Sequence, residues 1–337
     1  MVVIDGSQGE GGGQILRTAL SLSMVTGKAL RIENIRAKRP KPGLMRQHLT
    51  CVQAAQAISS ADVSGVELGS TAITFVPKAI KAGNYHFAVG TAGSTTLVFQ
   101  TVLPALMLAD AESTLSFEGG THNLSAPTFD FITLAYLPAL KRMGIEVGAQ
   151  IERHGFYPQG GGRWQAVIKP VSGFQRLDLL SAGPLLKREA VVTTANIPGH
   201  VAQRELGQVA KLCRWPDEDL HIQNVECLGG GNVVSMRLHH QHCSELIEYM
   251  GRLGVTAEKV ARSAIDATRR YQVAKVPVGE HLADQLLLPM AIGKGGEFRT
   301  LKPSRHTLTN MAVIERFMDR CFATKELSKD RWEIELT

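Results

Sequence analysis

Residues 5–17 of this 337-residue sequence, DGSQGEGGGQILR, carry the residue types of an anion-binding site. They combine five glycines with the carboxylate of Glu10 and the guanidinium of Arg17. Glycine lets the backbone approach a ligand closely, and the free N–H groups of a helix's first turn face bound phosphate. The segment lacks the spacing of a P-loop or of a dinucleotide fingerprint. We therefore expect a phosphate-binding loop of another kind that leads into a helix.

A basic loop follows at residues 36–46, where five cations occur within eleven residues: Arg36, Lys38, Arg39, Lys41 and Arg46. Gln47 and His48 come directly after it, and no acidic residue occurs between Ile35 and Ser60. The planar guanidinium group of arginine suits bidentate binding of phosphate. The pattern favours a second part of an anionic site, followed by a helix from about Leu44, over a solvated charged surface.

His306 is the candidate nucleophile. It lies in the segment TLKPSRHTLTN, at the junction of a predicted strand and a predicted helix. An isolated histidine is more often structural. The chain, however, offers no Gly-x-Ser-x-Gly elbow and no cysteine beside a histidine in a plausible active loop. We therefore predict that His306 lies in a central cleft together with the basic loop, since both hold equivalent places in an internal repeat.

Three glutamines mark that repeat. Gln14, Gln100 and Gln285 each open an apolar helix that continues into a turn, a strand and a second helix. Apolar residues in the second helices recur at the spacing of a core-facing stripe. The glutamines lie 86 and 185 residues apart, so the second interval is 99 residues longer. We predict three α/β units in residues 1–180 and 277–337, with a domain of residues 181–276 inserted before the third.

The inserted residues have a pattern of their own. We expect strands at REAVVTTANI, DLHIQNVEC and NVVSMRLHHQ, a helix at HVAQRELGQVAKLCR, and two further helices at CSELIEYMGRLG and TAEKVARSAIDATRRYQ. The sequence favours a scaffold or partner platform. His239, His240, His242 and Cys243 form its densest group of metal-ligand types, but their spacing matches no zinc signature and is more typical of a polar surface loop.

The bulk properties narrow the class of protein. A formal net charge of +6 favours an anionic partner such as nucleic acid or nucleotide. The five cysteines are scattered and form no C-x-x-C pair, which is typical of reduced thiols. No signal peptide and no apolar run of membrane-spanning length is evident, so we expect a soluble cytoplasmic protein without a membrane partner. The oligomeric state stays open.

Six motifs occur in an order that resembles the RNA 3'-terminal phosphate cyclase family over essentially the whole chain. The motifs are DGSQGEGGGQILR, the basic loop ending in RQH, GGTHNLSAP, HGFYPQGGG, VGEHLADQLLLPMA and SRHTLTN. The resemblance implies an α/β fold of three βαβαββ-type repeats, like those of enolpyruvyl transferases, with a smaller α/β domain inserted before the third repeat.

The same resemblance implies an ATP-dependent ligase. Such an enzyme converts an RNA 3'-terminal phosphate to a 2',3'-cyclic phosphodiester through a covalent histidine-AMP intermediate and an RNA adenylate. His306 would be the nucleophile, and Glu10 would hold Mg²⁺ or Mn²⁺. The residues implied to bind nucleotide or phosphate are Gln100, His281, Leu282, Ala283, Asp284, Gln285, Arg17, Arg36, Arg39, Arg46, Gln47 and His48. The family often has tyrosine where this chain has His281, and the resemblance implies that the imidazole of His281 stacks on adenine in its place.

Two alternatives use the same fold. A non-catalytic cyclase-like factor for ribosomal RNA processing lacks the nucleophilic histidine, whereas this chain has His306. An enolpyruvyl transferase needs neither ATP nor the inserted domain nor the SRHTLTN segment.

Overall fold

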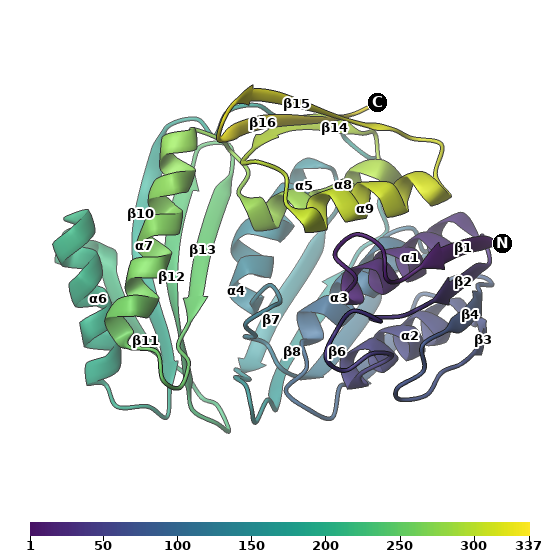
Figure 1. The fold of residues 1–337 in the computed structure, drawn as a ribbon, viewed down its shortest axis with the longest axis horizontal. Helices are drawn as coiled ribbons and strands as arrows, with labels where there is room; N and C mark the ends of the chain where they lie inside the picture. Colours follow the sequence, from purple (N-terminus) through teal and green to yellow (C-terminus); the bar gives the residue numbers. More distant parts are fainter.

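The computed structural model describes residues 1–337 and contains three copies of one α/β unit (Figure 1). Each unit runs strand, helix, strand, helix, strand, strand and forms one four-stranded sheet. The first two strands of a unit pair in parallel, and the last two complete the sheet with antiparallel pairing. The sheets have the equivalent orders β1-β2-β4-β3, β5-β6-β8-β7 and β9-β14-β16-β15. The α/β repeats expected from the sequence are confirmed.

The first unit contains both the glycine-rich segment, residues 5–17, and the basic loop, residues 36–46. Helix α1 begins directly after Gly12 and ends at Gly27, whose φ of 69° is the left-handed conformation that favours glycine. Helix α2 begins at Arg46, within two residues of the expected start. The elements in order are β1 (Val2–Asp5), α1 (Gly13–Thr26), β2 (Leu30–Glu33), α2 (Arg46–Ser59), β3 (Asp62–Ser64) and β4 (Ile73–Val76).

The second unit has an irregular second helix, in which a π-helical segment separates two short α-helical ones. The side chain of Thr128 caps its N-terminus by accepting a hydrogen bond from the N–H of Phe131 at 2.9 Å. The elements are β5 (Asn84–Ala88), α3 (Thr95–Leu106), β6 (Ser113–Gly119), α4 (Phe129–Phe131), η1 (Ile132–Tyr136), α5 (Leu137–Arg142), β7 (Val147–Arg153) and β8 (Gly162–Ile168).

The third unit is split by the insertion. Its first strand, β9, precedes the inserted residues and pairs in parallel with β14, which follows them. The insertion therefore lies between the first strand and the first helix of this unit. The elements are β9 (Leu177–Leu179), α8 (Glu280–Ile292), β14 (Gly296–Thr300), α9 (Arg305–Phe317), β15 (Phe322–Ser328) and β16 (Arg331–Leu336).

The inserted residues form a sheet of order β11-β10-β12-β13 that α6 and α7 cover (Figure 1). They have a hydrophobic cluster of their own, which includes Val192, Val234 and Ile265. The elements are β10 (Leu185–Ala195), α6 (His200–Cys213), η2 (Asp217–Asp219), β11 (Leu220–Asn224), β12 (Gly231–His240), β13 (Ser244–Met250) and α7 (Ala257–Ala274).

The helix expected at CSELIEYMGRLG is wrong. Residues 244–250 form strand β13, which pairs antiparallel with β12 from His239 opposite Ser244 to Val233 opposite Met250. A short apolar run such as Leu246-Ile247 does not distinguish helix from strand by its period. The backbone N–H and C=O groups of β12 form hydrogen bonds with residues 244–250, and this pairing outweighs the intrinsic helix propensity of the segment.

Two of the glutamines also lie deeper in their helices than the repeat predicted. Gln14 is the second residue of α1, but α3 begins at Thr95 and α8 at Glu280, five residues before Gln100 and Gln285. The segments TTLVF and EHLAD that precede Gln100 and Gln285 are already helical, so these two glutamines mark the helix interior and not the start of the helix.

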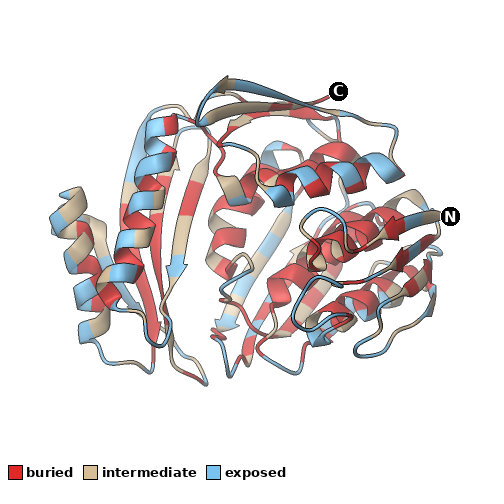
Figure 2. Cartoon of the chain, viewed as in Figure 1, coloured by how far each residue is buried: buried red, intermediate tan, exposed pale blue.

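The helices of the three units pack together beneath their sheets. Helix α1 contacts α2, α3 and α9, and its residues Leu16 and Leu20 are fully buried in the main core. Buried residues gather on the sides of these helices that face the sheets and one another (Figure 2). No helix combines the length and the apolar character that crossing a membrane requires.

Candidate active site

The N-termini of α1 and α9 meet at the loop of residues 6–12 between β1 and α1, which we call the glycine-rich loop. The guanidinium group of Arg305 donates a hydrogen bond to the carbonyl oxygen of Gly9 at 3.0 Å. The backbone N–H of Glu10 donates to Oγ1 of Thr309 at 3.1 Å. Helix N-termini carry partial positive charge and unpaired N–H groups. Two such ends at one loop make an environment that favours a bound anion.

His306 lies in the first turn of α9 and is exposed to solvent. Ser304 caps this helix, because its side chain accepts a hydrogen bond from the N–H of Thr307 at 3.1 Å. The Nδ1 atom of His306 lies 2.8 Å from Oε1 of Gln14. The cap and this hydrogen bond hold an accessible imidazole at the mouth of the glycine-rich loop.

Gln14 assigns the tautomer of His306. Its amide nitrogen Nε2 donates a hydrogen bond to Oδ2 of Asp284 at 2.9 Å, so Oε1 is the atom that faces the imidazole. Because Oε1 only accepts, Nδ1 of His306 must carry the hydrogen. The Nε2 atom of a neutral His306 is then left with its lone pair, which is the nucleophilic form.

Asp284 connects α8 to α1 through Gln14 and to α9 through Asn310. Its backbone oxygen accepts a hydrogen bond from Nδ2 of Asn310 at 2.7 Å, and Asn310 in turn accepts one from Oγ1 of Thr18 at 2.7 Å. Burial raises the pKa of Asp284 to about 7, against the opposing effects of Gln14 and Arg17. A strongly shifted carboxyl next to an exposed imidazole is typical of a functional site.

The remaining residues implied for the nucleotide pocket lie on α3 and α8. Gln100 donates a hydrogen bond from Nε2 to Oε1 of Gln285, whose own Nε2 donates to the carbonyl oxygen of His281 at 2.9 Å. His281 is exposed. The side chains of Leu282 and Ala283 are buried in the main core, so they face away from solvent.

Glu10 has one carboxylate oxygen to spare. Its Oε2 atom lies 2.6 Å from Nη2 of Arg39, whereas its Oε1 atom is buried and has no partner. The Glu10 side chain is 4% exposed. Burying an unpaired carboxylate oxygen is costly. A cation with oxygen ligands fits this position, because it would pair the orphaned atom.

Arg17 and His48 lie against the first residue of α1. A Cβ atom on Gly13 would overlap Nε2 of His48 and would come within 3.0 Å of Nη1 of Arg17. Burial, reinforced by Arg17 and Arg36, lowers the pKa of His48 to about 3. His48 is therefore neutral at physiological pH. The positive charge beside Gly13 comes from Arg17.

The other residues of the basic loop differ in their placement. Arg36 braces the loop, since its Nη1 atom donates to the carbonyl oxygens of Lys41 at 2.6 Å and Gly43 at 2.9 Å. Gln47 accepts a hydrogen bond from the N–H of Ser94, the N-cap of α3, at 2.8 Å. The Arg46 side chain is exposed and makes no hydrogen bond or ion pair.

Gln14 is the residue that sequence reasoning missed. It served only as a marker of the repeat, yet it contacts both His306 and Asp284. The recurrence of glutamine in the repeat was the signal that could have identified it. Gln14 forms a hydrogen bond with Asp284 on α8, and Gln100 forms one with Gln285. The glutamines that recur along the chain therefore gather around one site in the fold.

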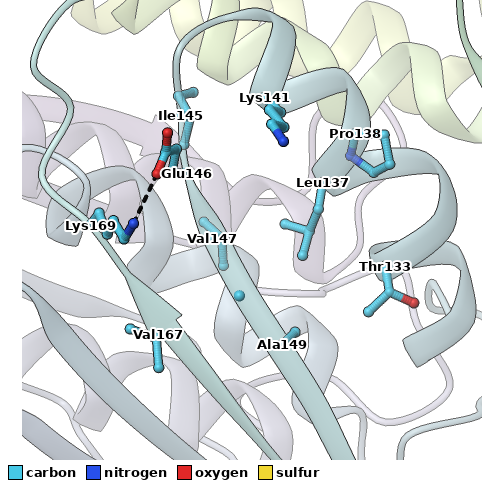
Figure 3. Close-up of a pocket in the computed structure, with 11 residues that line it drawn as sticks. Thr133, Leu137, Pro138, Lys141, Ile145, Glu146, Val147, Ala149, Val167 and Lys169 are labelled. Atoms are coloured by element: carbon cyan, nitrogen blue, oxygen red, sulfur yellow. Dashed lines mark hydrogen bonds and ion pairs between the residues drawn. The ribbon is translucent and has the colours of Figure 1, made fainter.

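Two other features lie apart from this site. His239, His240 and His242 each contact a different hydroxyl or carbonyl oxygen, and no three of the group converge on one point. His239 and His240 are half-buried at the end of β12, so the polar surface loop expected here is wrong for them, and only His242 is exposed in the turn that follows. A surface hollow between α5 and strands β7 and β8, with the 3.1 Å ion pair of Glu146 and Lys169 at one side, contains no residue of the site (Figure 3).

Residues 8–324 match the RNA 3'-terminal phosphate cyclase family. The chain belongs to this family. Among curated relatives, an RNA 3'-terminal phosphate cyclase of Koribacter versatilis is 47% identical over 327 residues, which are 97% of this chain and 92% of the relative. Another, of Ectopseudomonas mendocina, is 49% identical over 310 residues, 92% of this chain and 91% of the relative.

The residues that match the cyclase family include the segments that build the site, from the glycine-rich loop to the first turn of α9. Among solved structures, the enolpyruvyl transferase NikO of Streptomyces tendae aligns with 96% of this chain and 46% of its own, with a TM-score of 0.39 and 11% identity. So distant a likeness has no bearing on the chemistry of this cyclase-family site.

Proposed function

We propose that this member of the cyclase family converts an RNA 3'-terminal phosphate to a 2',3'-cyclic phosphodiester at the expense of ATP. The reaction has three steps: transfer of AMP to His306, transfer of AMP to the RNA phosphate, and ring closure with release of AMP. The observation that carries the proposal is the chain of hydrogen bonds from Asp284 through Gln14 to an exposed His306.

In the first step, Nε2 of His306 attacks the α-phosphorus of ATP, and the bond to the leaving pyrophosphate breaks. Gln14 supports this step because it holds the hydrogen on Nδ1 and keeps Nε2 free. The phosphoramidate bond that forms is reactive enough for AMP to be passed on. Arg17 and Arg39 lie at the glycine-rich loop, where they would offset negative charge on the triphosphate.

The second and third steps take place on RNA. An oxygen of the terminal 3'-phosphate attacks the phosphorus of the histidine-bound AMP, the P–N bond breaks, and His306 leaves, so that the RNA end becomes an activated anhydride. The neighbouring 2'-hydroxyl then attacks that phosphorus, and AMP leaves. Since the last step needs a 2'-hydroxyl, a chain that ends in a 2'-deoxynucleotide cannot be cyclised. The net charge of +6 and the exposed cations of the basic loop favour binding of an RNA end.

Mg²⁺ or Mn²⁺ fits beside Glu10, whose buried Oε1 atom has no partner. A divalent ion there supplies charge neutralisation for phosphate oxygens when it is bound. Glu10 is the protein ligand, and Arg39 holds its second oxygen in place at 2.6 Å. One carboxylate together with substrate phosphate and water is the usual environment of Mg²⁺.

Intact-protein mass spectrometry tests the proposal. The wild type, His306→Ala and a control variant at the exposed His200, His200→Ala, are incubated with ATP and Mg²⁺ without RNA. We expect an AMP adduct on the wild type and the control and none on His306→Ala. Addition of a 3'-phosphorylated oligoribonucleotide should then discharge the adduct and yield a cyclic end, whereas a 2'-deoxy terminus should stop at the adenylated stage.

Absence of an adduct on folded wild-type protein would contradict the proposal. That outcome would favour the second candidate function, a non-catalytic factor for ribosomal RNA processing. An adduct that persists in His306→Ala would assign the nucleophile to another residue.

A further inference from the structure

Two motifs of the sequence contribute histidines that the proposed reaction does not use. His122 belongs to GGTHNLSAP, which follows β6, and His154 begins HGFYPQGGG, which follows β7. The two imidazole rings lie 5.1 Å apart, centroid to centroid, at an interplanar angle of 32°. Asp130, in the short helix α4, completes the group.

These three side chains converge on one point. Each offers a ligand atom, and the three atoms lie within 4.8 Å of one another. The Nε2 atom of His122 is 3.9 Å from Oδ1 of Asp130, too far for a hydrogen bond. None of the three residues bonds to a side chain of the His306 site.

His122 has an unused nitrogen. Its side chain is fully buried, Nδ1 lies 2.8 Å from Oγ1 of Thr121, and Nε2 has no partner. A buried nitrogen without a partner is costly to retain unless a ligand pairs it.

Asp130 is oriented by the inserted domain. Its Oδ2 atom lies 2.6 Å from Nη2 of Arg237 on β12, and its Oδ1 atom accepts no hydrogen bond and lies toward His122. Glu248 on β13 is half-buried, with Oε2 bonded to Thr128 at 2.6 Å and Oε1 without a partner.

We propose that Nε2 of His122, a ring nitrogen of His154 and Oδ1 of Asp130 bind one zinc ion. Two imidazoles and a carboxylate form a donor set that suits zinc, whereas Mg²⁺ prefers oxygen ligands alone. Three protein ligands leave a fourth position for water. Tetrahedral bonds of the usual length place ligand atoms roughly 3.4 Å apart, so the 3.9 Å separation closes by about half an ångström on binding.

The zinc site links the second unit to the insertion. His122 and His154 follow two strands of the second sheet, and the ion pair of Asp130 with Arg237 continues the contact into β12. Such outer partners orient a metal ligand and tune its affinity. The ion would hold the two loops and strand β12 of the inserted domain in one arrangement. This role is separate from the chemistry at His306.

Zinc titration of the full-length protein tests the proposal. The protein is stripped with a chelator, and zinc alone is added in competition with a chromophoric chelator. We expect one tight equivalent for the wild type, and affinities lowered by more than about 100-fold in His122→Ala, His154→Gln and Asp130→Asn. His306→Ala serves as the control and should keep the tight equivalent, because the active-site histidine plays no part in this site.

Cobalt substitution gives a second measurement. Co²⁺ bound through imidazole nitrogen should produce a visible absorption spectrum in the wild type and in His306→Ala, and lose it in the three ligand variants. If His122→Ala does not fold, His154→Gln and Asp130→Asn provide the same comparison. The absence of a tight equivalent in the wild type, or its loss in His306→Ala with retention in the ligand variants, would overturn the proposal.

Discussion

Gln14 accepts a hydrogen bond from Nδ1 of His306 at 2.8 Å across a separation of 292 positions in the chain. The contact needs the first turn of α1 and the first turn of α9 to face each other, which the packing of the first and third units provides. Because Gln14 also donates to Asp284, its amide cannot turn around without losing one of the two hydrogen bonds. The orientation of the imidazole therefore depends on the arrangement of the repeats.

Removal of the Gln14 amide should slow the first step more than it weakens ATP binding. In Gln14→Leu nothing holds the hydrogen on Nδ1 of His306, so the reactive tautomer and ring orientation are populated less. We expect the rate of AMP transfer to His306 to fall on the order of 10²-fold, within the range of catalytic positioning effects. Single-turnover mass spectrometry of the adduct, at several ATP concentrations, separates rate from affinity.

Gln53→Leu, on the exposed face of α2, is the control and should leave the rate unchanged. An unaltered rate in folded Gln14→Leu would show that His306 is oriented by other contacts.

Glu10→Gln should raise the metal requirement. The change keeps the shape of the side chain but removes the charge that the buried Oε1 atom offers to a cation. We expect the Mg²⁺ concentration for half-maximal AMP transfer to rise by about tenfold or more. The matched control is Glu118→Gln, which alters the exposed 3.0 Å ion pair with Arg163 and should have no effect. Equal metal curves for Glu10→Gln and the wild type would remove Glu10 from the metal site.

Gly13→Ala should disable the site without a large loss of stability elsewhere. The new Cβ would overlap Nε2 of His48, and it would meet Nη1 of Arg17 at 3.0 Å, so one or both side chains must move. We expect AMP transfer to fall by about tenfold or more, since small displacements of positioning groups cost this much. Gly207→Ala is the control, because a Cβ there meets nothing within 4 Å. It should raise Tm slightly, as alanine favours the helix interior.

The repeats were predictable because apolar period and spacing are local properties of the chain. The strand at Ser244–Met250 was not, because its pairing with β12 is a tertiary contact that a short apolar run does not encode. The same distinction applies to the site. The glycine-rich loop and His306 were visible as motifs, whereas the role of Gln14 depends on which helix ends meet. The unpaired oxygen of Glu10 is likewise a product of burial alone.

A buried carboxyl at the junction of the inserted domain and α8 should make stability depend on pH. Glu245 is 2% exposed and accepts a hydrogen bond from the N–H of Gly279, the N-cap of α8, at 2.8 Å. Burial raises its pKa from 4.5 to about 8. The folded state therefore holds the proton more tightly than the unfolded state does. The stability from this group is present at acid pH and is lost as pH rises from about 4.5 to about 8.

Glu245→Gln should abolish that loss, because glutamine keeps an acceptor for Gly279 and does not ionise. We expect its Tm to exceed that of the wild type by about 4 °C or more near pH 9 and to approach the wild-type value near pH 5. Calorimetric scans across this pH range measure the difference. Glu67→Gln, at an exposed position, should follow the wild type throughout. A Tm difference that does not grow with pH would mean that Glu245 is ionised in the folded protein, so that the hydrogen bond at the start of α8 outweighs burial.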